Sequence, residues 1–181
     1  MKALSVVTAG VLTGVRPAFA RDDDKRAGAT QFFTPEEAKL VEAISEQLIP
    51  ADKDPGAKDA MVVMFIDRQL VGTYAQHQAT YRRGLSAFQE TCRKQFGKSF
   101  EALAWDDQTK VLASLESGRA PQELWKSPSG QEFFNLVVEH TKQGFYGSPQ
   151  HGGNHNYVSF QMLGIDHDYH PLPDRRSGGK K

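Results

Sequence analysis

The sequence is poor in cysteine and has no excess of charge of either sign, and both facts exclude classes of function. Cys92 is the only cysteine among 181 residues, which excludes an intrachain disulfide, a CxxC redox pair, a cysteine-rich zinc or iron–sulfur site and a CxxCH haem attachment. Basic and acidic residues number 22 each, so no net positive field would attract nucleic acid or an anionic membrane. Nucleic acid is therefore not an expected partner.

Motifs that bind nucleotides or define common hydrolases are also missing. No GxGxxG follows a strand pattern, and GxxxxGK[ST], GxSxG and HExxH do not occur. We therefore expect no catalytic residues and no cofactor in this chain.

The first 20 residues have the pattern of a signal peptide. Lys2 supplies the positive start, residues 3–15 form an apolar stretch too short to span a bilayer, and Ala18-Phe19-Ala20 is a cleavage signature. There is no twin-arginine pair. We expect export to the periplasm, a mature chain starting near Arg21, and a flexible, polar segment over residues 21–31.

Apolar residues recur at helical spacing over residues 32–146, which predicts one helical domain. Thr34-Pro35-Glu36-Glu37 is a capping box that opens a helix over about 35–49. Further helices are expected over 61–70, 81–92 and around 111–115, and a last one opens at 127–129. No stretch alternates β-branched residues. The sequence therefore predicts an all-α fold, an irregular bundle of about five to six helices with a long, irregular C-terminal arm.

Cys92 lies on the apolar stripe of the helix predicted over 81–92. Tyr81, Leu85 and Phe88 precede it at spacings that place all four on one face. We therefore expect a buried core cysteine rather than a reactive one.

Histidines gather late in the chain and leave two interpretations open. His151 and His155 would share a metal ion if they were helical, but Gly152-Gly153 between them favours a turn. The first interpretation is ordinary hydrogen bonding in loops or at an interface. The alternative is a stand-alone, metal-dependent periplasmic enzyme built on His140, His151, His155, His167 and His170, with Asp166 and Asp168 beside the last two.

Residues 147–181 are predicted to form an irregular arm that ends in a basic tail. The segment mixes aromatic residues, amides and glycines without an apolar period, a composition that suits contact with another protein. The competing interpretation is that the arm folds back over its own bundle. The residues expected to contact a partner are Tyr146, His151, Gly152, Gly153, Asn154, His155, Asn156 and Tyr157.

Several segments together resemble the gluconate 2-dehydrogenase subunit 3 family, the small (gamma) subunit of membrane-bound gluconate 2-dehydrogenase. The resemblance covers roughly residues 32–165. It rests on the order and spacing of FFTPEEAKLVEAISEQLIPAD, FIDRQLVGTYA, DDQTKVLASLESG, EFFNLVVEHTKQGFYGSPQHGGN and MLGI. Where the family's usual segment resembles YGGNRDxxGWKLIG, this chain has HGGNHNYVSFQMLG.

The resemblance implies a non-catalytic subunit of an oxidoreductase complex. In that family a large partner of the glucose–methanol–choline type holds FAD and the catalytic residues, and a cytochrome c subunit commonly passes electrons onward. The small subunit stabilises the large one and escorts it to the periplasm. Related small subunits accompany enzymes acting on other sugars and glycosides, so the expected substrate is a sugar, sugar acid or glycoside. Association with the inner membrane is expected only through the complex.

Overall fold

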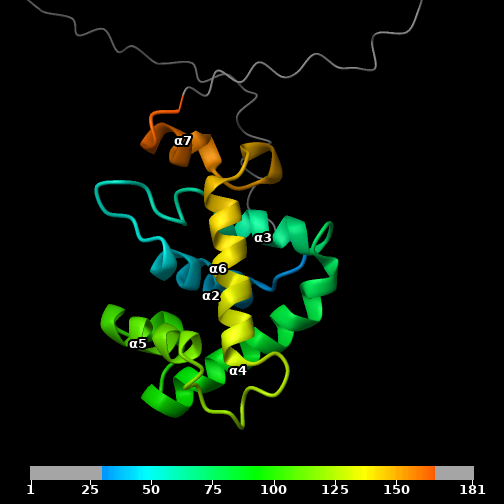
Figure 1. Ribbon diagram of the computed structural model, residues 1–181, viewed down its shortest axis with the longest axis vertical. Coiled ribbons are helices and arrows are strands. Elements are labelled where there is room, and N and C mark those ends of the chain that lie inside the picture. Colours follow the sequence, from blue (N-terminus) through cyan, green and yellow to red (C-terminus); the bar gives the residue numbers. More distant parts are fainter. Residues whose placement is uncertain (1–29, 166–181) are drawn as a thin grey trace, which may run out of the picture.

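The computed structural model describes residues 30–165, and within them the chain is helical and contains no strand (Figure 1). The predicted signal peptide, most of the segment 21–31 and the basic tail lie outside the described residues. The all-α prediction is confirmed. In order, the elements are α2 (Pro35–Leu48), α3 (Val62–Leu70), η1 (Ala75–His77), α4 (Gln78–Phe96), η2 (Phe100–Ala102), α5 (Trp105–Glu116), α6 (Gly130–Tyr146), η3 (Pro149–His151), η4 (His155–Tyr157) and α7 (Val158–Met162), where η denotes a short 3-10 helix.

Helix α6 runs through the middle of the bundle and contacts α2, α3, α4, α5 and α7 (Figure 1). It begins at Gly130, slightly later than the sequence indicates, because the Ser129 hydroxyl accepts from Glu132 N–H while the Glu132 carboxylate accepts from Ser129 N–H. Its inward side chains are fully buried. They include Phe133, which approaches α4 so closely that a Cβ on Gly84 would overlap its ring.

The remaining predicted helices are present with modest changes of length. The Thr34–Glu37 capping box forms and α2 ends one residue before the predicted boundary. Helix α4 extends the predicted 81–92 segment at both ends and stops at Gly97, whose φ of 69° is a left-handed conformation. None of the helices within 30–165 combines the length and the apolar character that crossing a bilayer needs.

Cys92 is buried in the core, as predicted. Burial raises the pKa of its thiol to about 12, so the thiolate, which is the nucleophilic form, is scarce at neutral pH. The residue is packed as a small apolar side chain.

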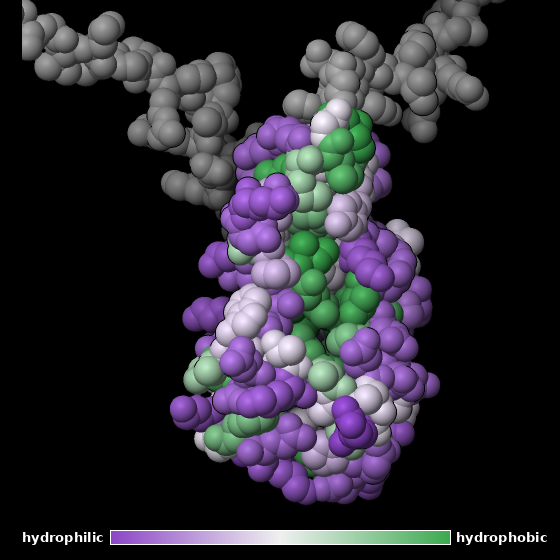
Figure 2. All heavy atoms as spheres, turned by 60° about the vertical axis from the view of Figure 1, so that its left-hand side comes forward, coloured by the Kyte–Doolittle hydropathy of each residue, from purple (hydrophilic) through white to green (hydrophobic). Residues whose placement is uncertain are grey.

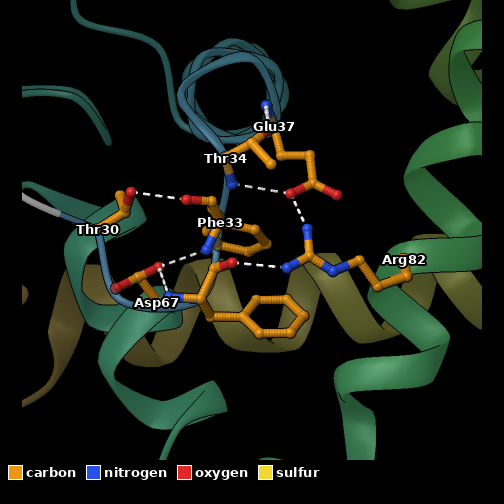
Figure 3. Close-up of polar contacts among 7 residues, drawn as sticks. Thr30, Phe33, Thr34, Glu37, Asp67 and Arg82 are labelled. Carbon is orange, nitrogen blue, oxygen red and sulfur yellow. Dashed lines mark hydrogen bonds and ion pairs between the residues drawn. The ribbon is translucent and has the colours of Figure 1, made fainter.

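Asp67 anchors the start of the described chain to α3, and the sequence did not indicate it. Its side chain is fully buried. One carboxylate oxygen accepts from Gln31 N–H at 2.6 Å. The other accepts from Phe32 N–H at 3.0 Å and Phe33 N–H at 2.9 Å (Figure 3). A carboxylate can remain buried when its lone pairs accept charge-assisted hydrogen bonds of this kind.

Arg82 of α4 holds the same segment from the other side. Its guanidinium donates to the Phe32 carbonyl oxygen at 2.7 Å and to the Glu37 carboxylate, and it lies over the Phe32 ring (Figure 3). The chain before α2 is therefore fixed against both α3 and α4.

We expect Asp67→Asn to lower the free energy of unfolding by about 2–4 kcal/mol, because the neutral amide replaces one acceptor oxygen by a donor that faces backbone N–H groups. Urea unfolding followed by circular dichroism measures the change. Glu116→Gln, at an exposed position of α5, is the control and should stay within about 0.5 kcal/mol of the unsubstituted chain. Equal stabilities of the two variants would contradict the anchoring role of Asp67.

Candidate functional site

The arm is held on α6 by a close contact between two backbones. Gly153 lies so near Gly144 that an added Cβ would overlap the Gly144 carbonyl oxygen. That oxygen accepts from Asn154 N–H at 2.8 Å. On its other side Gly144 packs against Phe65 and Val62 of α3. The two glycines are therefore where α3, α6 and the arm meet.

Asn154 fixes the course of the arm from inside. Its side chain is fully buried, donating through Nδ2 to the Gly147 carbonyl oxygen at 3.0 Å and accepting at Oδ1 from Ser159 N–H at 2.9 Å. The next residue, His155, donates its N–H to the Ala60 carbonyl oxygen at 3.1 Å. These bonds join the arm to the end of α6, the start of α7 and the loop before α3.

The arm turns through several left-handed residues. Gly152 has φ of 99°, which only glycine adopts readily, and Asn154, Asn156 and Tyr157 have φ of 43°, 54° and 60°. A left-handed conformation at a bulky residue such as Tyr157 costs on the order of 1–2 kcal/mol. The contacts of Gly153 and Asn154 supply the constraint that holds this turn.

The eight residues predicted to contact a partner are placed differently by the structure. Gly153 and Asn154 are buried against the chain's own bundle, and Gly152 and Tyr157 are half-buried. Exposed positions are taken by Tyr146, His151, His155 and Asn156. The arm over residues 147–165 thus folds back on its own bundle, and its contact with a partner stays a prediction.

Large apolar side chains are exposed near the end of the described chain. Tyr146 is 47% exposed, Leu163 55% and Ile165 48%. Figure 2 shows hydrophobic surface at the top of the molecule, the end that carries α7 in Figure 1. Exposed apolar groups clustered in this way favour contact with another protein.

His140 belongs to the interior of the bundle rather than to the arm. Its Nδ1 lies 3.0 Å from the Tyr81 hydroxyl, and its ring stacks on Tyr74 with 4.5 Å between centroids. His77 approaches the ring edge-on at 5.5 Å between centroids. Burial, with a further contribution from His77, lowers the pKa of His140 to about 4, so the imidazole is neutral at pH 7.

The metal-enzyme alternative receives no support from the described residues. No group of three or more histidine, cysteine, aspartate or glutamate side chains within 30–165 is arranged to hold a metal ion. His140 stacks in the core, while His151 and His155 are exposed on separate short turns, η3 and η4. His167 and His170 lie outside the described residues. The helical spacing that the pair His151 and His155 would need is broken at Gly152, as expected.

Sequence reasoning missed the contribution of α3 to this end of the molecule. The arm contacts α3 through η3, and Arg68 lies across Gly152. A usable signal was present, because residues 69–81 contain no aspartate, glutamate, lysine or arginine in a chain that is 24% charged. Such charge depletion is typical of the core of a protein interface.

His140 predicts an acid-sensitive component of stability. Its folded pKa of about 4 lies below the ordinary value of 6.5, so the unfolded chain binds the proton more readily. The neutral His140 imidazole therefore contributes roughly 3 kcal/mol to the free energy of unfolding. This contribution is complete above pH 6.5 and is lost as the pH falls to about 4. In urea titrations at several pH values, the stability advantage over His140→Gln should shrink across this window. The exposed control His151→Gln should follow the unsubstituted chain, and parallel curves for all three would contradict the assignment.

The contacts of Gly153 and Asn154 with α6, here called the latch, can be tested with small substitutions. We expect Gly153→Ala and Asn154→Ala each to cost about 2–3 kcal/mol, through backbone overlap and lost buried hydrogen bonds respectively, and to speed amide hydrogen exchange in residues 147–165. Ser159→Ala is the matched control, because its buried hydroxyl has no hydrogen-bond partner within 30–165 and its loss should be neutral or slightly stabilising. Unchanged exchange in both arm variants would overturn the latch.

Comparison with known proteins gives one clear result. A family model described as gluconate 2-dehydrogenase subunit 3 matches residues 35–166, well over half of the chain. No curated protein matches the sequence, and no solved structure matches it. The family's description names a subunit of a multi-subunit dehydrogenase. The chain belongs to the gluconate 2-dehydrogenase subunit 3 family.

Proposed function

We propose that this chain is a non-catalytic small subunit that stabilises a large FAD-dependent dehydrogenase and escorts it to the periplasm. The complex oxidises a sugar, sugar acid or glycoside, and the FAD and the catalytic residues belong to the large subunit. The family match over residues 35–166 is the observation that carries this proposal.

The surface chemistry of the arm supports a docking role. The exposed positions Tyr146, His151, His155 and Asn156 combine an aromatic ring with hydrogen-bonding groups, and Leu163 and Ile165 add apolar area. Aromatic residues are enriched at protein interfaces because one ring buries a large area with little loss of conformational entropy. The latch at Gly153 and Asn154 holds these groups in place before assembly, which reduces the ordering cost of binding.

Stabilisation of the large subunit follows from mass action. A partner that binds the folded state of the large subunit and not its unfolded state raises its stability in proportion to the logarithm of the partner concentration over Kd. Export rests on the signal pattern of residues 1–20, and a c-type cytochrome would accept electrons from the large subunit.

The proposal is tested by expressing the chain, tagged at its C-terminus, together with the large flavoprotein of its own organism. We expect affinity capture to yield a complex with the absorption spectrum of bound flavin and dye-linked oxidation of sugars, whereas the small chain alone should be colourless and inactive. A small chain that purifies alone with stoichiometric metal and its own activity would overturn the proposal.

The docking role of the arm has its own test. The double variant Tyr146→Ser and His155→Ala changes exposed side chains only, and we expect it to capture roughly tenfold less flavoprotein at equal stability. Trp105→Ser is the matched control, since it removes another half-exposed aromatic residue at the start of α5, away from the arm. Equal capture by all three chains would remove the arm from the interface.

A further inference from the structure

A shallow hollow of about 370 Å³ lies where the C-terminal end of α3 meets the start of the arm. Helix η3 contacts α3 directly, which closes the hollow on one side. None of the lining side chains carries a permanent charge, so the hollow suits an uncharged side chain of a partner. Lining residues include Phe65, Gln69, Thr73, Tyr74, Gln143 and His151.

Arg68 lies beside this hollow. It precedes the lining residue Gln69 in the sequence, and its side chain lies against Gly152, which follows the lining residue His151. Its Nη1, Cδ and Cζ atoms lie only 2.7–3.2 Å from the place that a Cβ on Gly152 would occupy, so the glycine leaves the room in which the guanidinium rests. Arg68 is exposed, and its guanidinium makes no hydrogen bond or ion pair within residues 30–165. Arg82 on α4, in contrast, is fully engaged by Glu37 and Phe32.

The surroundings of Arg68 are poor in charge. Residues 69–81 carry no charged side chain apart from the titratable His77, and residues 140–165 carry only Lys142 and histidines. Val71, on the turn after α3, is an exposed large apolar residue. Depletion of lysine and acidic residues around an arginine with aromatic neighbours is the composition of an interface core rather than of ordinary surface.

Charge complementarity decides what covers this surface. The nearby carboxylate of Asp67 is buried with both oxygens accepting backbone N–H groups, and Glu139 accepts from Gln143 Nε2 at 2.7 Å. The exposed Glu139 carboxylate that a second copy would offer Arg68 already accepts a hydrogen bond from Gln143 at one oxygen, and an anionic membrane would need a larger cluster of cations than Arg68 and Lys142. We therefore expect the complementary anion on a different protein.

We propose that the surface formed by Arg68, Val71 and the hollow beside them, here called the α3–η3 surface, is a second docking site for the large dehydrogenase subunit, and that Arg68 pairs there with a carboxylate of that subunit. This rests on the proposed function. The segment that docks carries an apolar side chain for the hollow next to an acidic residue for the guanidinium. Arginine suits this place because its planar fork binds a carboxylate through two parallel hydrogen bonds.

Reversing the charge at position 68 tests the α3–η3 docking site separately from the proposed subunit role. We expect Arg68→Glu to weaken capture of the large flavoprotein at least about tenfold while leaving the urea midpoint of the free chain unchanged. Lys98→Glu, an exposed lysine in the loop after α4, is the matched control and should capture as the unsubstituted chain does. If the unsubstituted chain and Arg68→Glu capture the flavoprotein equally, the α3–η3 surface is not an interface, although the subunit role stands. If no chain captures the flavoprotein, both the docking site and the subunit role are overturned.

The expected ion pair is tested directly with Arg68→Lys. A carbodiimide joins a lysine amine to a carboxylate in contact with it, with loss of one water. In the complex we expect a cross-link between position 68 and an aspartate or glutamate of the large subunit, identified by mass spectrometry; links from other lysines alone would overturn the pairing.

Three further measurements examine other occupants of the surface. Self-association of the free chain that Arg68→Glu abolishes would assign the surface to a second copy, and Arg68-dependent sedimentation with phosphatidylglycerol vesicles would assign it to a membrane. A chain ending at Ile165 that captures the flavoprotein much more strongly would assign it to the chain's own residues 166–181. Each of these results would overturn the proposal. We expect no self-association and no sedimentation that depends on Arg68, and equal capture by the chain that ends at Ile165.

Discussion

The close approach of Gly144 and Gly153 is the constraint on which the position of the C-terminal arm depends. A side chain at Gly153 would meet the carbonyl oxygen of Gly144, and one at Gly144 would press on Phe65 and Val62 of α3. The arm therefore comes close enough for Asn154 to bond with α6 only because Gly153 lacks a Cβ, and α6 comes close to α3 because Gly144 lacks one. That contact determines where the arm residues His151 and His155 are exposed.

Two kinds of hydrogen bonding hold the rest of the bundle in place. Capping boxes at Thr34 and Ser129 satisfy the first N–H groups of α2 and α6 locally. Asp67 acts over a long sequence separation, because its buried carboxylate accepts three backbone N–H groups of the segment before α2. The local bonds define where the helices begin, and the long-range bonds define how the segments between them lie.

The predicted roles of the histidines divide according to their surroundings. His140 lies among Tyr74, Tyr81 and His77, where burial keeps it neutral. His151 and His155 are exposed on turns that surround Gly152. No group of three or more candidate metal ligands forms within the described residues, so the structure gives the metal interpretation no support there.

The sequence by itself determined the helices, the buried Cys92 and the turn at Gly152, because caps, apolar periodicity and glycine preference act between residues close in the chain. It also carried the resemblance that the family match confirmed. Only the tertiary structure decided that Asn154, predicted to contact a partner, is buried as the latch of the arm, that Asp67 is an internal anchor, and that Arg68 lies against Gly152. Asp67 and Arg68 meet residues tens of positions away, and Asn154 bonds across a turn to residues five to ten positions away. No local pattern of the sequence records which segment a polar side chain will meet.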